Sequence, residues 1–352
     1  MTERRMRSAL LRWYDREARD LPWRRTQDPY AIWISETMLQ QTRVETVIPY
    51  YERFLSRFPT VETLADADAD DLMEHWAGLG YYRRARNLQA AARCVVDEHG
   101  GALPDEIEGL LSLPGVGRYT AGAVASIAFD RPAPIVDGNV ARVFARVFGI
   151  REELRSAPVQ ARLWEKAEAL ARGLRPGDLN QAVMELGATL CTPRAPECPR
   201  CPLARHCDAR EAGDASALPV KAAKKPPKRV AAVAARLERN GKFLAVRRPP
   251  KGLLGGLWEL PGGDLSPGET PEATASRSLH ERVGLIAKVC EPLGSVEHVF
   301  THRRLTLHVL RVKVGPERVR RQGYDAHRWL SEAALNALPL SKIARKAIAL
   351  GR

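Results

Sequence analysis

The chain has 352 residues, of which 45% are hydrophobic, and its 55 Lys and Arg against 42 Asp and Glu give a formal net charge of +13. This composition is that of a globular protein long enough for two domains, and the longest apolar run, residues 121–129, is too short for a membrane span of roughly 20 residues. The positive charge suits a polyanionic partner, although an Arg-rich composition alone explains it equally well.

The N-terminal stretch, residues 1–20, carries charges throughout and has neither the apolar core nor the cleavage site of a secretory signal. We therefore expect a cytoplasmic protein that does not enter a membrane. A reducing cytosol argues against a disulfide framework and favours metal or cluster ligation where cysteines lie close together in the sequence.

The chain divides into three parts by its pattern. Up to about residue 210 the apolar positions have helical spacing, as in the stripe formed by Val140, Val143, Phe144, Val147 and Phe148. Residues 211–229 are basic and contain a Pro pair, which favours a linker. Short β-like runs and one helical stretch follow. We predict an all-α domain over residues 1–210, a linker over 211–229 and an α+β domain over 230–352.

Glu36 stands out in the first part because it lies within an apolar helical stretch, residues 32–39. A Glu on an exposed helix face is the common case. Burial among apolar neighbours would instead raise the pKa of the carboxyl and let it carry a proton near neutral pH. Glu36 is therefore a candidate general acid.

Residues 108–128 predict two helices joined by a turn that contains Pro114, Gly115, Val116 and Gly117. Two glycines permit a tight turn with uncovered backbone N–H groups at a helix N-terminus, which can hold a phosphate directly or through a monovalent cation. An ordinary Gly-rich turn is the alternative. The pattern resembles the helix-hairpin-helix of DNA repair proteins.

Asp137 follows the hairpin and directly precedes the helix that begins near Val140. Its simplest role is that of an N-cap. The positive end of the helix dipole would also keep the carboxylate ionised, and an ionised carboxylate can stabilise a cationic sugar. Hairpin, spacing and Asp together resemble the helix-hairpin-helix glycosylase superfamily, and this resemblance implies that Asp137 is catalytic.

Four of the six cysteines lie within residues 191–207, in the spacing C-x6-C-x2-C-x5-C: Cys191, Cys198, Cys201 and Cys207. A zinc site more typically shows two separated pairs, whereas four thiolates also suit a cubane cluster. The spacing resembles the [4Fe–4S] loop of endonuclease III and the MutY family of adenine glycosylases, and the resemblance implies such a cluster. We expect Cys94 and Cys290 to be core residues.

The stretch around Glu36 resembles the motif of the MutY family, and the resemblance implies roles for further residues. Glu36 would protonate adenine and Asp137 would stabilise the oxocarbenium-like sugar. Tyr119 stands where relatives that also cleave the strand have Lys, so a Schiff base is not expected. By the same resemblance, Tyr119 and Asn139 place the water and Asp137.

The resemblance also implies residues that contact the flipped adenine and the DNA. The adenine pocket is expected to be lined by Trp23, Arg24 and Glu185. A wedge must fill the space that the extruded base leaves, and the candidates for this wedge are Gln41, Thr42, Leu79 and Tyr81. Apolar and aromatic residues at such spacing also fit a plain core role.

The last part follows the frame of a Nudix box, which is kept at Gly263, Glu269, Arg277, Leu279, Glu281, Gly284 and Leu285. Ser278 and Arg282 replace two carboxylates that a magnesium-dependent pyrophosphohydrolase needs. The domain resembles the Nudix-like C-terminal domain of the MutY family, which reads 8-oxoguanine. That resemblance implies that Phe300, Thr301 and His302 form the reading loop, although a strand end with a hydroxyl cap is the plain alternative.

Together these features predict a monofunctional DNA glycosylase of base excision repair that acts as a monomer on double-stranded DNA. We expect it to hydrolyse the bond to adenine paired with 8-oxoguanine or with G. An endonuclease III-like glycosylase with lyase activity, a non-catalytic DNA damage-binding protein and a nucleotide pyrophosphohydrolase are the alternatives. Tyr119 argues against the first, Glu36 and Asp137 against the second, and Ser278 and Arg282 against the third.

Overall fold

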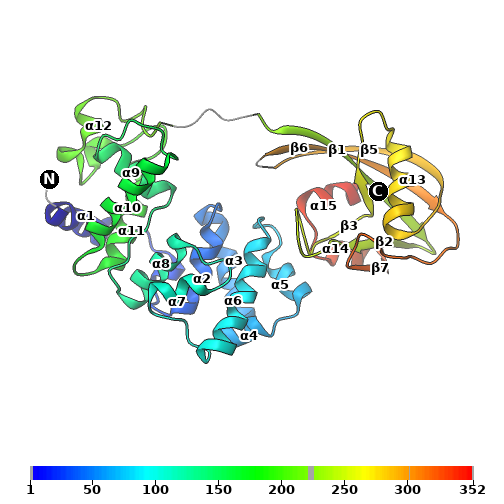
Figure 1. The fold of residues 1–352 in the computed structure, drawn as a ribbon, viewed down its shortest axis with the longest axis horizontal. Coiled ribbons are helices and arrows are strands. Elements are labelled where there is room, and N and C mark those ends of the chain that lie inside the picture. Colours follow the sequence, from blue (N-terminus) through cyan, green and yellow to red (C-terminus); the bar gives the residue numbers. More distant parts are fainter. Residues whose placement is uncertain (1–2, 221–225, 301, 351–352) are drawn as a thin grey trace. The chain divides into compact units, whose positions relative to one another are not determined.

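The computed structural model describes residues 3–220, 226–300 and 302–350 (Figure 1). The chain folds as two compact units, Met1–Asp66 with Arg86–Lys224 and Ala67–Ala85 with Lys225–Arg352, hereafter the first and the second unit. The first unit is helical and the second is built on a sheet, which confirms the predicted fold class. The contiguous domain limits did not anticipate that residues 67–85 pack with the later part of the chain.

The helices of the first unit follow one another with short connections. They are α1 (Glu3–Glu17), η1 (Pro22–Arg24), α2 (Pro29–Leu39), α3 (Val44–Arg57), α4 (Val61–Ala65), most of α6 (Arg83–His99), α7 (Ile107–Ser112), α8 (Arg118–Phe129), α9 (Gly138–Val147), α10 (Ala157–Ala171), α11 (Pro176–Thr189), η2 (Cys198–Arg200), η3 (Ala204–His206) and α12 (Asp208–Glu211). Within the described residues, no helix has both the length and the apolar character needed to cross a bilayer.

Helix α9 shows how the sequence specifies this core. Its apolar stripe is buried at Val140, Val143, Phe144 and Val147, while Phe148 at its C-terminal end is half-buried. The stripe packs on α1, α10 and α11 in one hydrophobic cluster. Since the buried face fixes the rotation of the helix about its axis, the N-terminus at Asp137 has a defined position.

The second unit contains helix α5 (Ala69–Trp76) and a seven-stranded sheet. The strands are β1 (Lys228–Arg239), β2 (Lys242–Arg247), β3 (Trp258–Glu259), β4 (Gly262–Asp264), β5 (Ala287–Val299), β6 (Arg303–Val314) and β7 (Ala326–Leu330). Their order is β3-β2-β1-β6-β5, with β4 also on β1 and β7 also on β2. Strands β1 and β6 are parallel, with Val230 opposite Leu305, and the other pairs are antiparallel.

Alternation along the strands gives this sheet two apolar faces. Val233 and Leu237 of β1 pack with α13 (Pro271–Val283) in one cluster. Ala234 packs with α14 (Glu332–Ala337) and α15 (Lys342–Ala349) in the other, and Trp258 joins that cluster. Because successive side chains point to opposite faces, a strand that buries both must be apolar at nearly every position, as the middle of β1 is. The sheet is thus covered by helices on both faces (Figure 1).

Candidate functional site

Glu36 lies on α2, and the residues around it on this helix are buried as well. The residue is 4% exposed, and Tyr119 of α8 donates a hydrogen bond of 2.6 Å from Oη to Oε2 of Glu36. Burial raises the pKa of Glu36 to about 7, with a further rise from the negative charge of Asp137, while the bond from Tyr119 opposes the rise. A carboxyl with this pKa carries a proton in a large fraction of molecules near neutral pH, as the sequence predicted.

Tyr119 is itself held as a neutral hydroxyl. Burial, followed by the negative charges of Glu36 and Asp137, raises its pKa well above the ordinary value. Its Oη lies 3.2 Å from Sδ of Met184 on α11, a neighbour that sequence reasoning missed. Tyr119 can therefore donate to Glu36, and it offers no amine to a sugar.

Asp137 is the N-cap of α9, as predicted. Its Oδ1 accepts from the backbone N–H groups of Asn139 at 2.9 Å and Val140 at 2.7 Å, and Oδ2 accepts from Nδ2 of Asn139 at 3.0 Å. Burial nevertheless raises the pKa of Asp137, and these three bonds oppose the rise. The bonds at the helix terminus therefore favour the ionised form, as expected, whereas desolvation, the larger influence on the pKa, opposes it.

Asn139 connects Asp137 to a residue that the sequence did not single out. Its Oδ1 accepts a bond of 2.8 Å from Nη2 of Arg142, which also bonds the carbonyl oxygens of Gly187 and Cys191. The orientation of the Asn139 amide is therefore fixed from both ends. The signal that could have identified Arg142 is its place in the otherwise buried face of α9.

The three residues predicted to line an adenine pocket have different surroundings. Trp23 and Arg24 line a cavity together with residues of α8 and α11, and Glu36 is not among the lining residues. Glu185 is 1% exposed and accepts bonds from the guanidinium groups of Arg19 and Arg24, each with a distance of 2.9 Å or less. Burial alone would raise the pKa of Glu185, but the two arginines lower it overall. Glu185 therefore orients Arg24, and it is not among the residues that line this cavity.

Removal of this carboxylate is expected to destabilise the fold. Glu185→Ala leaves the half-buried Arg19 and Arg24 without their anion, so we expect a loss of about 3 kcal/mol in the free energy of unfolding. Glu168→Ala, which removes the exposed partner of Arg172, is the matched control and should cost less than about 1 kcal/mol. Urea denaturation measures both, and equal losses would contradict the role of Glu185.

The hairpin between α7 and α8 has the geometry that its glycines predict. Gly115 has φ of +78°, and a Cβ atom there would lie 2.4 Å from Nδ2 of Asn87. Gly117 is the N-cap of α8, and a Cβ atom there would meet open space. Val116 between them is half-exposed. The first N–H groups of α8 therefore lie at an open surface, where a phosphate or a cation-bridged phosphate can approach.

The candidate wedge residues differ in exposure. In the first unit, Gln41 is exposed with φ of +59°, and Thr42 follows it half-buried. In the second unit, Tyr81 is 48% exposed with φ of +46°, while Leu79 is 6% exposed. The burial of Leu79 agrees with the plain core role that the sequence also allowed, whereas Gln41 and Tyr81 present accessible side chains.

The four cysteines of residues 191–207 surround one small cavity, whose walls also include Arg146 and Leu186. Arg146 of α9 is 1% exposed and donates to Sγ of Cys191 at 3.2 Å, to the carbonyl oxygen of Thr192 at 2.8 Å and to that of Leu218 at 3.0 Å. Arg142 and Arg146, one helical turn apart, thus tie the cysteine loop to the helix that Asp137 caps.

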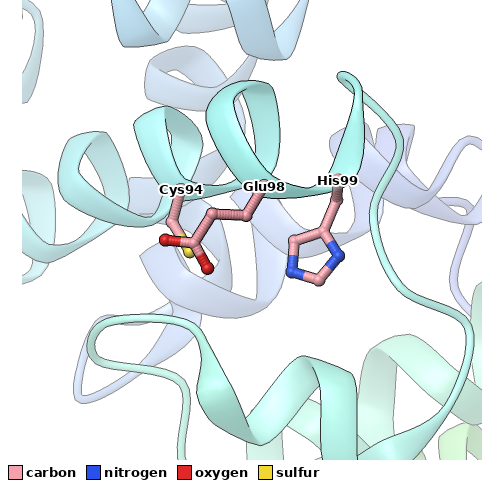
Figure 2. A group of neighbouring side chains, drawn as sticks. All are labelled: Cys94, Glu98 and His99. Carbon is pink, nitrogen blue, oxygen red and sulfur yellow. The ribbon is translucent and has the colours of Figure 1, made fainter.

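A second group of candidate metal ligands lies in α6, remote from this loop in the sequence. Cys94, Glu98 and His99 of α6 each offer one possible ligand atom, and these three atoms lie within 4.8 Å of one another (Figure 2). Cys94 is half-buried, and partial burial and the carboxylate of Glu98 raise its pKa.

In the second unit, Arg282, one of the two residues that replace Nudix carboxylates, has structural partners, whereas the buried Oγ of Ser278 has no hydrogen-bond partner among the described residues. Arg282 donates to the carbonyl oxygens of Gly262 at 2.6 Å and Gly323 at 3.2 Å, and its guanidinium lies 4.1 Å from the ring of Tyr324. Ser278 is 2% exposed. Glu269 is paired with Arg277, whose hydrogen bond lowers the pKa of the carboxyl to about 2. The guanidinium of Arg282 would repel a cation at this place.

The predicted reading loop joins β5 to β6. Phe300 is half-buried, contacts the ring of His298 at a centroid distance of 4.5 Å and lines a cavity with Arg303. His302 is exposed, and its carbonyl oxygen accepts from the backbone N–H of Lys228 at 3.0 Å. Thr301 lies outside the described residues.

Comparisons with known proteins agree with this architecture. Residues 34–169 match the HhH-GPD superfamily of base excision DNA repair proteins, and residues 232–350 match the NUDIX domain. An adenine DNA glycosylase of Homo sapiens is 39% identical over 97% of this chain and 72% of its own length, and one of Arabidopsis thaliana is 37% identical over 97% of this chain and 63% of its own. A solved thermostable thymine-DNA glycosylase is similar over 60% of this chain and 97% of its own, with 33% identity and a TM-score of 0.55.

Proposed function

The chain belongs to the family of adenine DNA glycosylases, hydrolases of base excision repair, and from that premise we propose that it removes adenine paired with 8-oxoguanine or with guanine. One observation carries the mechanism: the buried Glu36 accepts a hydrogen bond from Tyr119, and the negative charge of Asp137 contributes to its raised pKa. In a family that binds DNA, two acidic groups in different environments are suited to hydrolysis of a glycosidic bond.

Glu36 is proposed to act as the general acid. Its proton passes to a ring nitrogen of the flipped adenine while the glycosidic bond breaks, so the electron pair of that bond leaves with a neutral base. The pKa of about 7 matches this task, because the acid is then strong enough to donate and still protonated in much of the population. Tyr119 orients the carboxyl through its bond to Oε2.

Asp137 is proposed to stabilise the positive charge that develops on the sugar. The three N–H groups that bond its carboxyl favour the anionic form against the effect of burial. Asn139 holds one oxygen and is itself fixed by Arg142, so the carboxylate does not have to reorganise as charge develops. Water then adds to the sugar carbon, and its proton restores the carboxyl of Glu36.

The cysteine loop is proposed to hold a [4Fe–4S] cluster through Cys191, Cys198, Cys201 and Cys207. The residues fit the group, because the four cysteines line one cavity and Arg146 supplies a positive charge beside Cys191. A cluster at this place would stiffen the loop that Arg142 and Arg146 tie to α9.

Metal analysis of anaerobically purified protein tests this assignment. We expect about four irons per chain and broad visible absorption, which Cys198→Ser should abolish. Cys94→Ser is the control, since Cys94 is remote from the loop in sequence and lines none of that cavity, and it should leave the iron content unchanged. One zinc per chain without iron would contradict the assignment.

The second unit is proposed to read the base opposite adenine. Phe300 and His302 flank the turn between β5 and β6, where a ring and an imidazole can contact a base edge. Arg282, bonded to two carbonyl oxygens, leaves the former Nudix box without the cation site that hydrolysis of a nucleotide would need.

Single-turnover assays on duplexes with A opposite 8-oxoguanine, G or T, and on one with an oxidised pyrimidine, test the proposal. We expect free adenine from the first two duplexes, fastest opposite 8-oxoguanine. Phe300→Ala should reduce the ratio of the release rates opposite 8-oxoguanine and opposite G by roughly 5-fold to 100-fold, the equivalent of a few lost base contacts. Release of the oxidised pyrimidine, or an unchanged gap, would contradict it.

A further inference from the structure

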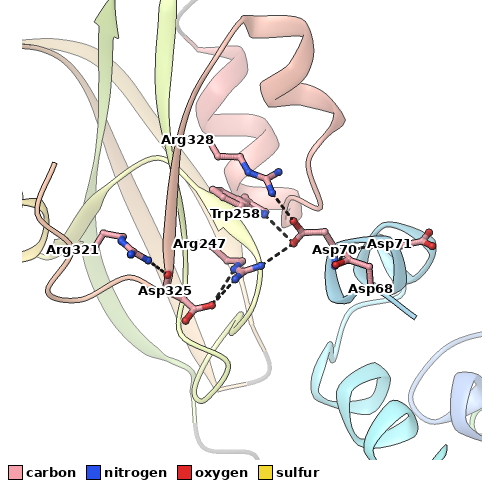
Figure 3. Close-up of polar contacts among 8 residues, drawn as sticks. All are labelled: Asp68, Asp70, Asp71, Arg247, Trp258, Arg321, Asp325 and Arg328. Atoms are coloured by element: carbon pink, nitrogen blue, oxygen red, sulfur yellow. Dashed lines mark hydrogen bonds and ion pairs between the residues drawn. The ribbon is translucent and has the colours of Figure 1, made fainter. Parts of the chain in front are cut away.

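Asp70 of α5 makes a set of contacts that the reaction does not explain. Its Oδ1 accepts from Nε1 of Trp258 on β3 and from Nη1 of Arg247 on β2, and its Oδ2 accepts from Nη2 of Arg328 on β7, all at 3.3 Å (Figure 3). These partners lie 177 or more positions away in the chain. One carboxylate therefore joins α5 to three strands of the sheet within the second unit.

The groups of the sheet that contact Asp70 are arranged around the indole of Trp258. Trp258 is fully buried, so its N–H needs an acceptor, and Asp70 supplies it. The guanidinium groups of Arg328 and Arg247 lie 4.8 Å and 5.8 Å from the Trp258 ring. Asp325 fixes Arg247 through bonds of 2.8 Å and 3.1 Å. Two arginines against the single carboxylate of Asp325 leave a positive charge that a second carboxylate neutralises.

Asp70 is equally well fixed from its own side. Asp68 caps α5 and its Oδ1 accepts from the backbone N–H of Asp70 at 2.8 Å, which sets the first turn of the helix. The last residue of α5, Trp76, donates from Nε1 to the carbonyl oxygen of Gly80 at 3.2 Å. This bond holds the turn of residues 78–82 against the end of helix α5, and the exposed Tyr81 lies on that turn.

We propose that Asp70 is a positioning residue for lesion recognition, because it holds α5 and the turn with Tyr81 on the same sheet from which the Phe300 to His302 loop extends. This rests on the proposed function. Because Asp70 joins the turn to the sheet that carries the loop, binding of the loop to 8-oxoguanine raises the effective concentration of Tyr81 at the DNA base stack. Faster excision opposite 8-oxoguanine therefore depends on the contacts of Asp70 with the sheet. Excision opposite G gains less from the loop, so it depends less on these contacts.

Asp70→Asn tests this, since it removes the charge with little change of shape. We expect adenine release opposite 8-oxoguanine to fall about tenfold and release opposite G to stay within about twofold, the size of an ordinary coupling between sites. Arg328→Gln should do the same, and the double variant should lose no more than either single one. Glu74→Gln, which removes an exposed charge from the same helix, is the matched control.

Hydrogen exchange of the full protein separates this inference from the proposed function. Asp70→Asn should speed exchange of the α5 amides, while Glu74→Gln should not. If the wild type prefers 8-oxoguanine and Asp70→Asn keeps both that preference and slow exchange, the positioning role is wrong. If Asp70→Asn speeds exchange but the wild type shows no such preference, the docking contact stands and the proposed function fails. Additive losses in the double variant would also overturn the pairing with Arg328.

Discussion

Replacement of Glu36 by Gln is expected to reduce single-turnover adenine release at least about 10³-fold while duplex binding stays within about twofold of wild type. The amide has nearly the same shape as the protonated carboxyl, can still accept the bond from Tyr119, and has no acidic proton for the leaving base. Because Glu36 is buried and protonated in much of the population, Gln should also fit without a penalty for unpaired charge.

Glu165→Gln is the matched control for this prediction. It makes the same chemical change on an exposed face of α10, where Oε1 of the carboxylate lies 3.6 Å from Nζ of Lys166. Its rate should equal that of wild type, and thermal unfolding of both variants shows whether the fold is retained. Adenine release near the wild-type rate by Glu36→Gln would remove this residue from the reaction.

The second large effect is expected at Asp137. Asp137→Asn should lower the rate of adenine release about 10²-fold to 10³-fold, because the sugar loses the anion that stabilises its developing charge. One oxygen of Asn can keep the two backbone bonds of the cap, and Asn is as good an N-cap as Asp. The new amide group faces Nδ2 of Asn139, so one bond is lost and stability should fall by only about 1 kcal/mol.

Asp28→Asn separates the charge from the cap. Asp28 is the N-cap of α2, and its two carboxylate oxygens accept from the backbone N–H groups of Tyr30 and Ala31, so it is a second helix-capping carboxylate. The exchange should therefore leave activity unchanged. If Asp28→Asn and Asp137→Asn slow excision equally, the effect comes from altered helix ends and not from a carboxylate beside the sugar.

The sequence carried the parts of the site that depend on local spacing. The apolar stripe of α9, the cap at Asp137 and the two glycines of the hairpin each follow from a short stretch of chain, and the structure has all three. The high pKa of Glu36 also followed locally, since its neighbours on α2 are apolar and buried. Such features need no knowledge of distant segments.

What could not be predicted depends on contacts between distant segments. Arg19 and Arg24 pair with Glu185 across more than 160 positions in the chain, a contact that the local sequence pattern does not indicate. Leu79 and Tyr81 have the same apolar pattern, yet only Tyr81 is exposed. The docking of Asp70 on Trp258 joins residues that no periodicity connects.

The pH dependence of single-turnover adenine release, measured for wild type and for Tyr119→Phe, tests the central claim most directly. If protonated Glu36 donates to the base, the wild-type rate is highest below its pKa of about 7 and falls as the pH rises through that value. The bond from Tyr119 lowers this pKa, so its loss should move the fall to higher pH. A rate that does not fall with rising pH, or a fall that Tyr119→Phe moves to lower pH, would contradict the assignment of Glu36 as the acid.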